Sequence, residues 1–439
     1  MRKKRNAFTL IELLAVIVIL AVILVIAIPR ILDVIETSKK DSFKTSAQLI
    51  ADSAEKKKVS DKLLGKDEEI TCKDVAKIND EDYASCKISF DSEGNAKVSI
   101  TGKEKFDGLK ITNGTKENAE VIEITKPTYG MKAVEYITNL LEYDGEGLKI
   151  DNTPDQNIRY YGSNPNNYVL FNNELWRIIG VFGSNVKLIR NEKLGNLSWD
   201  SSESSINRGY GVNEWSQADL KNYLNTMYYE GTSVTCYNEK NNQTTTCPAN
   251  KLDETSKSLI DNHTWNIGAI DKTDTTIVNP ETFAINTVSF YKAERGTTNG
   301  KICNGRDACN DTVTRTTEWT GYIGLPYPTD YAYASSESDC ETNMNAGDID
   351  FDNGIFNMTC KKNNWMHHGT TMEIEDATWF MSPVADPDFA ANVWYVLGGG
   401  LTNDSCAAYP FSAFPTIYLK SNIIIESGKG TSSDPYILK

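Results

Sequence analysis

The feature that most constrains this chain of 439 residues is an unbroken apolar run near its start. Residues 2–5 are all basic, the apolar run extends from Leu13 to Ile28, and Pro29 closes it. As a helix, the segment 8–29 would be about 33 Å long, which matches the roughly 30 Å hydrocarbon core of a bilayer. The sequence therefore predicts a transmembrane helix over residues 8–29.

One acidic residue, Glu12, lies inside this apolar segment. An ionised side chain in lipid costs on the order of 3 kcal/mol or more. A carboxylate at this position therefore requires a partner, and the apolar run itself offers none.

The stretch from Arg2 to Leu14 resembles the class III leader and helix start of type IV pilins and type II secretion pseudopilins. That family has a short basic leader, a small residue, the cleavage site, a Phe, a Glu four residues later and a Pro twenty-one residues after the Phe, as here. The resemblance implies that prepilin peptidase cleaves between Ala7 and Phe8, and that Phe8 becomes N-methylated. Ala7 stands where the family usually has Gly; because Ala is still small, we expect cleavage. Glu12 and Pro29 are the residues implied to serve assembly with other pilin subunits.

Two other kinds of N-terminal segment share parts of this pattern. A secretory signal peptide also has a basic start and an apolar core, and Val25-Ile26-Ala27 resembles a signal-peptidase site. Ordinary signal peptides do not carry a Glu at the front of a core this long. A plain membrane anchor explains the length but not the sequence Phe8-Thr9-Leu10-Ile11-Glu12.

The charge distribution predicts where the chain lies. The net charge is −15, and removal of the basic leader would make it −19. No cluster of Lys and Arg occurs outside the leader, so we expect no nucleic-acid partner. The positive-inside rule places residues 1–7 in the cytoplasm and the chain after Pro29 outside. We expect a single-pass cytoplasmic-membrane protein before assembly and a cell-surface or pilus protein afterwards.

The nine cysteines predict local disulfides. In an extracytoplasmic protein, cysteines that are close in sequence are typical of such disulfides, and no C-x-x-C motif favours a zinc or redox site. Connectivity does not follow from sequence, and buried thiols are the alternative. The odd cysteine, Cys406, is expected to be buried as a small apolar residue. The eight disulfide candidates form four neighbouring pairs, Cys72 with Cys86, Cys236 with Cys247, Cys303 with Cys309, and Cys340 with Cys360.

The overall pattern predicts an α+β fold. Apolar residues Phe43, Ala47, Ile50 and Ala54 repeat at helical spacing, so one long helix is expected over 8–58. A small pilin-like head with an antiparallel sheet is expected over 60–125, including a hairpin that turns at Glu93-Gly94-Asn95.

The remaining chain is expected to form a linker with a short helix, 126–154, and a large β-rich domain, 155–439. All eight Trp lie after residue 126. Asn172-Asn173 is a tight-turn candidate between two strands, and a short helix is expected over 218–229. Leu175-Trp-Arg-Ile-Ile-Gly-Val, together with later segments, resembles an uncharacterised family of Gram-positive cell-surface domains. More distantly it is similar to the C-type-lectin-like group that includes formylglycine-generating enzymes.

Few residues in the large domain point to chemistry. No G-x-S-x-G, H-E-x-x-H or P-loop motif occurs, and two adjacent histidines, His367 and His368, rarely bind one ion. We therefore expect no enzymatic activity and no cofactor. Asp348, Asp350 and Asp352 alternate as in the start of a calcium loop, but the pattern departs from an EF-hand, and a solvated acidic turn is the alternative.

Aromatic residues in loop-like sequence are candidates for a carbohydrate or protein recognition surface. For each one singly, core packing is the alternative. They are Tyr327, Tyr331, Tyr333, Trp365, Tyr409 and Phe411.

Together these patterns predict a minor or tip type IV pilin-like subunit. Its large distal domain would bind an extracellular carbohydrate or protein ligand in the manner of an adhesin. Two alternatives remain open: a pseudopilin of a type II secretion or DNA-uptake system, and a membrane-tethered surface enzyme.

Overall fold

The computed structural model describes most of the chain. Its description omits residues 1–9, 67–68, 76–81, 144, 203–210, 240–241, 299–300, 303–315, 351–352, 354, 368–376 and 386–390. The fold is α+β, and the chain divides into two compact units. Unit 1 comprises residues 1–126 and 142–144, and unit 2 comprises 127–141 and 145–439.

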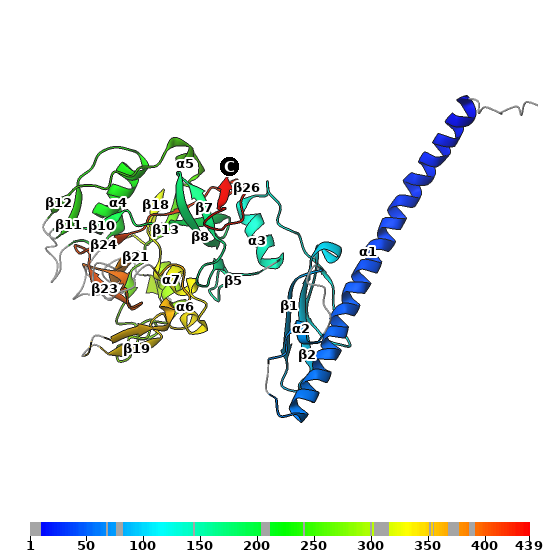
Figure 1. Cartoon of the computed structure of the whole chain (residues 1–439). Coiled ribbons are helices and arrows are strands. Elements are labelled where there is room, and N and C mark those ends of the chain that lie inside the picture. Colours follow the sequence, from blue (N-terminus) through cyan, green and yellow to red (C-terminus); the bar gives the residue numbers. More distant parts are fainter. Residues whose placement is uncertain are drawn as a thin grey trace, which may run out of the picture. The chain divides into compact units, whose positions relative to one another are not determined.

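Unit 1 is a long helix packed on a small sheet (Figure 1). The helix α1 spans Leu10–Leu63 and continues through Pro29. The sheet is antiparallel in the order β1-β2-β3-β4, with strands Tyr83–Phe90, Ala96–Gly102, Leu109–Gly114 and Ile122–Glu123. Two short helices complete the unit, α2 (Cys72–Val75) and η1 (Glu104–Phe106).

The apolar stripe predicted from the sequence is the face of α1 that packs on this sheet. Phe43, Ala47 and Ala54 are fully buried, and Ile50 nearly so. Their core includes Val98, Ile100 and Ile111 of the sheet, and the Phe43 and Phe106 ring centroids are 5.2 Å apart. The helical spacing brings these side chains to one face, and the sheet covers that face.

The predicted hairpin of the small sheet is confirmed. Phe90 pairs with Ala96 across the turn. The Asp91 carboxylate accepts hydrogen bonds from the backbone N–H groups of Glu93 and Asn95, and Gly94 has φ of +91°. A side chain that holds the turn and a glycine in the left-handed region explain why the chain reverses here.

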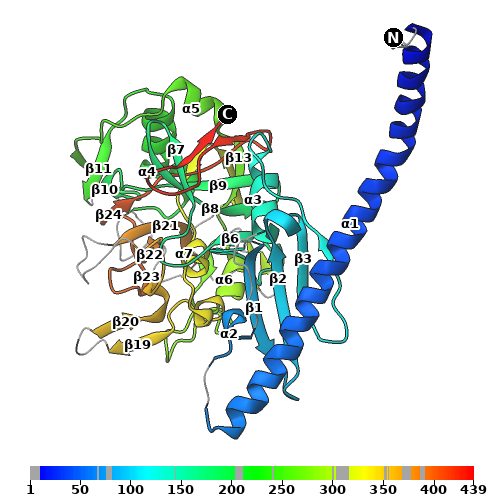
Figure 2. The same cartoon turned by 45° about the vertical axis from the view of Figure 1, so that its right-hand side comes forward.

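Unit 2 is built around two larger sheets (Figure 2). The nine-stranded sheet has the order β18-β25-β9-β8-β7-β27-β26, with β6 on β8 and β5 on β6. The six-stranded sheet has the order β10-β24-β21-β22-β23, with β14 on β21. Buried residues of both sheets, including Trp176 and Trp379, belong to one core.

The strands of the nine-stranded sheet are β5 (Leu148–Ile150), β6 (Ile158–Tyr160), β7 (Tyr168–Phe171), β8 (Glu174–Phe182), β9 (Asn185–Arg190), β18 (Ile323–Gly324), β25 (Thr416–Tyr418), β26 (Ile425–Ser427) and β27 (Tyr436–Leu438). Those of the six-stranded sheet are β10 (Gly195–Ser198), β14 (Ile270–Asp271), β21 (Thr378–Ala385), β22 (Asn392–Val396), β23 (Thr402–Cys406) and β24 (Pro410–Ala413).

Smaller elements surround these sheets. Four two-stranded sheets pair β11 (Cys236–Glu239) with β12 (Gln243–Thr245), β13 (His263–Asn266) with β17 (Glu318–Gly321), β15 (Thr297–Thr298) with β16 (Lys301–Ile302), and β19 (Gly347–Asp350) with β20 (Ile355–Met358). The helices are α3 (Ala133–Tyr143), η2 (Trp215–Gln217), α4 (Asp219–Asn222), η3 (Tyr223–Tyr229), α5 (Glu254–Leu259), α6 (Thr287–Glu294), α7 (Pro328–Ala334), η4 (Ser338–Glu341) and η5 (Thr359–Lys361).

The tight turn between β7 and β8 is confirmed. Asn172 and Asn173 have φ of 55° and 58°, the conformation that a two-residue hairpin of this kind requires. The helix expected over 218–229 differs from expectation, since α4 continues as a π-helix from Tyr223 to Tyr229.

The boundary of the large unit also differs from the expected linker over 126–154. Strand β5 pairs with β6, and Ala133 and Ile137 of α3 are buried in the core of unit 2. These residues therefore form part of the large unit rather than a connection to it.

Candidate functional site

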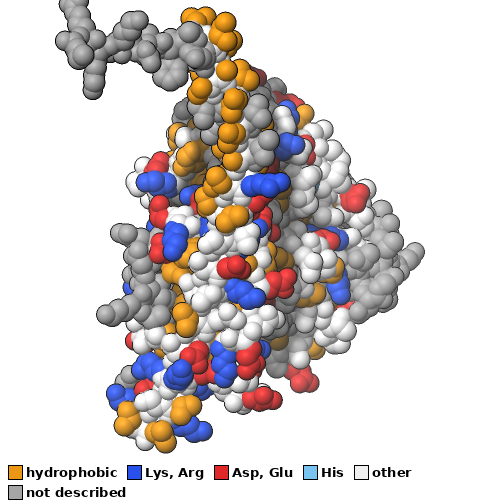
Figure 3. Space-filling view, turned by 90° about the vertical axis from the view of Figure 1, so that its right-hand side faces the viewer, with side chains coloured by type: hydrophobic (Ala, Val, Ile, Leu, Met, Phe, Trp, Pro, Cys, Tyr) orange, Lys and Arg blue, Asp and Glu red, His pale blue; other side chains and the backbone are white. Residues whose placement is uncertain are grey.

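The first part of α1 presents apolar side chains to solvent. Leu10 is 84% exposed, Val25 74% and Val34 68%. Figure 3 shows hydrophobic side chains, in orange, along this part of the helix. They point in several directions around the helix axis, so the described part of the chain leaves this segment without a cover. A helix that is apolar all round requires an apolar environment from outside its own chain. The exposed apolar residues are Leu10, Ile11, Leu13, Leu14, Val16, Ile17, Val18, Ile19, Ile23, Val25, Ile28, Ile31, Leu32, Val34 and Ile35.

The predicted processing and assembly residues are placed only in part. Ala7 and Phe8 lie outside the described residues. Glu12 lies in the first turn of α1, but its side chain is not described, and Pro29 lies inside the helix and is exposed. The predicted transmembrane segment, 8–29, is not confirmed: within the described part of the chain, no helix meets the length and apolarity of a membrane span.

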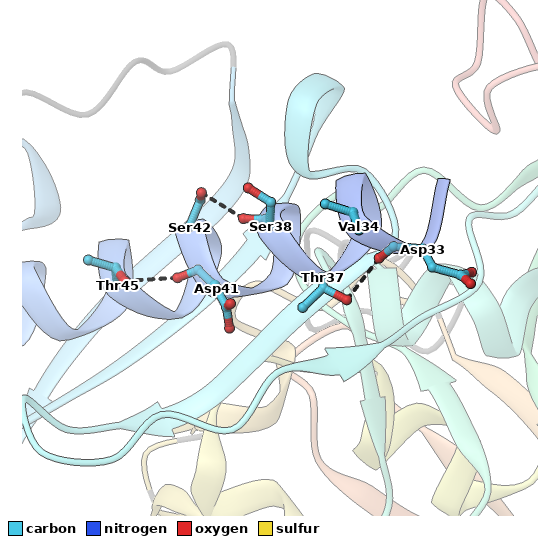
Figure 4. A pocket seen from close by; sticks show the side chains of 7 residues that line it. All are labelled: Asp33, Val34, Thr37, Ser38, Asp41, Ser42 and Thr45. Atoms are coloured by element: carbon cyan, nitrogen blue, oxygen red, sulfur yellow. Dashed lines mark hydrogen bonds between the residues drawn. The ribbon is translucent and has the colours of Figure 1, made fainter. Parts of the chain in front are cut away.

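A polar stripe follows the apolar part of α1 and borders a shallow hollow (Figure 4). Thr37 Oγ1 donates to the Asp33 carbonyl at 2.8 Å, and Thr45 Oγ1 donates to the Asp41 carbonyl at 2.8 Å. Ser42 bonds to the Ser38 carbonyl in the same way. The hydroxyls of Thr37, Ser42 and Thr45 thus bond to their own helix, whereas the carboxylates of Asp33 and Asp41 in the stripe are exposed to a neighbouring molecule.

Three of the four expected disulfides are present. They join Cys72 to Cys86, Cys236 to Cys247, and Cys340 to Cys360. Cys303 and Cys309 lie outside the described residues. Cys406 is half-buried and belongs to none of the three disulfides. The first disulfide links α2 to β1, and the third links η4 to η5.

The acidic candidates for calcium lie on the β19–β20 hairpin. The Asp350 carboxylate accepts hydrogen bonds from the backbone and side-chain nitrogens of Asn353. Asp348 lies in β19, and Asp352 lies outside the described residues. The described residues contain no group of three metal-ligating side chains, so calcium binding stays a prediction. Asp350 acts here as the residue that holds a turn.

Five of the six aromatic candidates for a recognition surface lie in the core, which is the alternative that the sequence left open for each of them. Tyr327, Tyr331, Tyr333, Trp365 and Phe411 are each at most 4% exposed, and only Tyr409, at 51%, is at the surface. The three tyrosines at 327–333 belong to α7 or cap it, and every residue of α7 is buried. They pack in the core because α7 is an internal helix and not a loop.

A buried network of charges lies in the core of unit 2, and sequence analysis missed it. Arg159 Nε lies 2.8 Å from Asp151 Oδ2, and Arg159 Nη1 lies 2.6 Å from Asp330 Oδ1. Lys187 Nζ lies 2.5 Å from Asp330 Oδ2. All four side chains are at most 1% exposed. The network joins β6, β9 and α7.

The network shifts the pKa of its members. Burial tends to raise the pKa of the Asp330 carboxyl, but Lys187 and Arg159 outweigh it, so the pKa is lowered. Burial lowers the pKa of Lys187 to about 8, although Asp330 opposes the shift. Both groups are therefore charged at neutral pH, and their mutual attraction offsets part of the cost of removing them from water.

Comparison with known proteins supports the N-terminal interpretation. Residues 2–28 match the family model described as the prokaryotic N-terminal methylation motif. The chain thus carries a type IV pilin-like prepilin segment, as found in pilin-like or pseudopilin proteins that prepilin peptidase processes and that assemble with other pilin subunits. Such a segment is typical of membrane-anchored, surface-displayed proteins. No curated protein and no solved structure matches this chain.

Proposed function

We propose that this protein is a minor or tip-located, non-enzymatic type IV pilin-like subunit that displays unit 2 as a ligand-binding, adhesin-like domain. The observation that carries the proposal is the prepilin segment at residues 2–28. It begins a chain in which most residues, 145–439, belong to a second compact unit.

The exposed apolar part of α1 supports a role in anchoring and assembly. The exposed apolar side chains that lie between Leu10 and Ile35 have no apolar cover within the described chain. Lipid would cover them before assembly, and the helices of neighbouring subunits would cover them afterwards. A helix of this kind in a bundle gains van der Waals packing with its neighbours in place of lipid contacts.

The size of unit 2 supports a minor or terminal position. Type IV filaments are expected to pack through thin N-terminal helices, and a domain of nearly 300 residues on every subunit would crowd such a filament. At a tip or at rare positions, the same domain is free to reach a ligand. The disulfides of unit 2 fit an extracytoplasmic location.

Gold-labelled antibodies against residues 145–439 test the proposal on intact cells. We expect label at filament ends or at sparse points along filaments, and the protein in sheared filament fractions. Label confined to the cell envelope, with none in sheared fractions, would favour a pseudopilin. Dense label along whole shafts would identify a major subunit. Either of these results contradicts the proposed minor or tip position.

A further inference from the structure

Arg177 is a buried cation with an unusual set of neighbours. It lies in β8, is 6% exposed, and its guanidinium carbon lies 4.1 Å from the Tyr168 ring centroid and 4.7 Å from that of Trp365. Its hydrogen bonds go to neutral oxygens only. Nε donates to Asn167 Oδ1 at 2.8 Å, and Nη2 donates to Asn164 Oδ1 and the Pro165 carbonyl.

The other strongly buried cations of the same sheet each have a carboxylate. Arg159 and Lys187 pair with Asp330 at 2.6 and 2.5 Å, and Arg190 pairs with Glu174 at 2.6 Å. Arg177 makes no ion pair with any described carboxylate, and its Nη1 has no hydrogen-bond partner among the described residues. Burying a charge without an anionic partner is costly, and burial lowers the pKa of Arg177 to about 10.

Arg177 is one of the residues that line a hollow of about 270 Å³. Its wall combines the rings of Trp365 and Phe414 with the hydroxyl residues Thr378 and Ser412. Lys193 and Glu192 lie at its exposed rim. The charged groups that line it thus sum to +1 on a chain whose net charge is −15.

We propose that this hollow binds the carboxylate of an acidic sugar residue, with Arg177 Nη1 as the donor. The inference rests on the proposed function, because it names the ligand class of the displayed domain. The bound carboxylate supplies the anionic partner that Arg177 lacks, and charge-assisted hydrogen bonds of this type are strong.

Two features favour an acidic sugar over a bare phosphate. Glu192 at the rim repels a doubly charged anion more than a singly charged carboxylate. Thr378 offers a hydroxyl, and the Ser412 hydroxyl, which donates to Asn196 Oδ1, is left to accept a hydrogen bond. Trp365 and Phe414 offer an apolar wall. These groups suit a sugar ring better than a compact oxyanion. The volume lies near the lower end for small-molecule sites, so it fits a single sugar ring.

Titration calorimetry and saturation-transfer NMR on the full-length processed protein in detergent test this site. The probes are D-glucuronate, N-acetylneuraminate, neutral D-glucose and inorganic phosphate. We expect at least one acidic sugar to bind and D-glucose not to bind. Arg177→Met keeps the bulk of the side chain and should weaken acidic-sugar binding about ten- to hundredfold, as expected for loss of a charged hydrogen bond.

Two further variants keep the test decisive if Arg177→Met does not fold. Lys193→Gln alters only an exposed rim residue and should weaken binding several-fold, whereas Lys251→Gln, exposed and outside the hollow, should leave it unchanged. Near-ultraviolet circular dichroism verifies the fold of each variant.

Three results would overturn the inference. They are absence of acidic-sugar binding by the folded wild type, unchanged binding in folded Arg177→Met or in Lys193→Gln, and binding of phosphate with no acidic sugar bound. None of these would alter the position of the protein on filaments. Conversely, if the protein binds acidic sugars but is absent from filaments, the proposed subunit role is refuted and the proposed sugar site is not.

Discussion

Lys187 Nζ and Asp330 Oδ2 lie 2.5 Å apart in the core of unit 2, and both side chains are at most 1% exposed. Asp330 also accepts a hydrogen bond from the Tyr327 backbone N–H at the start of α7. One carboxylate thus holds the start of a helix and pairs with two cations from different strands, and Asp151 supplies the second negative charge of the network. This ion pair therefore connects α7 to strand β9 of the nine-stranded sheet.

Asp330→Asn should destabilise unit 2 strongly, because Lys187 and Arg159 would stay buried with too little negative charge. Removing one partner of a buried ion pair typically costs about 3 to 5 kcal/mol. Urea unfolding followed by tryptophan fluorescence measures the change in the free energy of unfolding. Glu426→Gln removes an exposed partner of Lys439 and should cost about 1 kcal/mol or less. Equal stability of the two variants would contradict a structural role for the buried pair.

Glu294 predicts a pH dependence of stability. Burial raises the pKa of its carboxyl to about 7, against opposition from Arg295 and hydrogen bonds from Thr329. Between pH 4.5, the ordinary pKa, and about 7, the folded protein holds a proton that the unfolded chain has lost. This contribution to the free energy of unfolding therefore falls as pH rises through that window, by about 3 kcal/mol at most.

Glu294→Gln removes this titration and should flatten that part of the pH profile. Thermal unfolding at a series of pH values from 4.5 to 7.5 measures the slope. The prediction concerns the slope of stability against pH. It does not concern the absolute stability, because the substitution changes that as well. A slope equal to that of the wild type would show that other groups determine the pH dependence.

Local sequence patterns predicted the elements whose partners are close by. The stripe Phe43, Ala47, Ile50 and Ala54 identified the buried face of α1, because helical periodicity is visible within a few turns. The turn at Asn172-Asn173 was also predictable, because residues that tolerate positive φ separate two apolar strands.

Long-range partners were not predictable. Arg159 and Asp330 are 171 positions apart, and no local pattern reports such a pairing. The sequence did contain a signal that Arg177 and Lys187 are buried charges, because each is a charged residue within an otherwise apolar strand. The sequence Tyr327-Pro328 likewise carried a helix-start signal, because Pro is favoured at the first helical position. The polar residues around Tyr327 favour a loop instead, and a loop gives no reason to expect that Tyr327 is buried.

The Cys340–Cys360 disulfide should contribute to the stability of unit 2. It closes a segment with a sequence separation of 20, and native disulfides of this size typically contribute about 2 to 4 kcal/mol. The double variant Cys340→Ser, Cys360→Ser should therefore unfold at lower urea concentration.

Mass spectrometry without reductant should find this bond and the two other described disulfides in exported protein. Maleimide labelling of all these cysteines in native, unreduced protein would refute the prediction.

Processing is expected between Ala7 and Phe8. N-terminal sequencing of the membrane or filament protein should begin at Phe8, with an N-methyl group. Ala7→Asp should block cleavage because a charged side chain replaces the small residue before the scissile bond, and Ala7→Gly should be processed at least as well as the wild type. A mature N-terminus at Ile28 would instead indicate signal peptidase and contradict the prepilin interpretation.

Glu12 is expected to serve assembly rather than folding. A carboxylate isolated in lipid is costly, so the membrane state alone does not favour it. In a bundle of helices, the Phe8 amine of a neighbouring subunit would lie at the same depth, and pairing with it would offset the desolvation cost and fix the axial register.

Glu12→Ala should therefore be inserted, cleaved and folded, with a protease-resistant unit 2, yet enter sheared filament fractions at a fraction of the wild-type level. Glu230→Ala, an exposed substitution in unit 2, should assemble normally. Phe8 and Glu12 of one chain are also one helical turn apart, so a pair within the chain is the alternative contact. Normal incorporation of Glu12→Ala would show that this carboxylate is not the contact that sets the register between subunits.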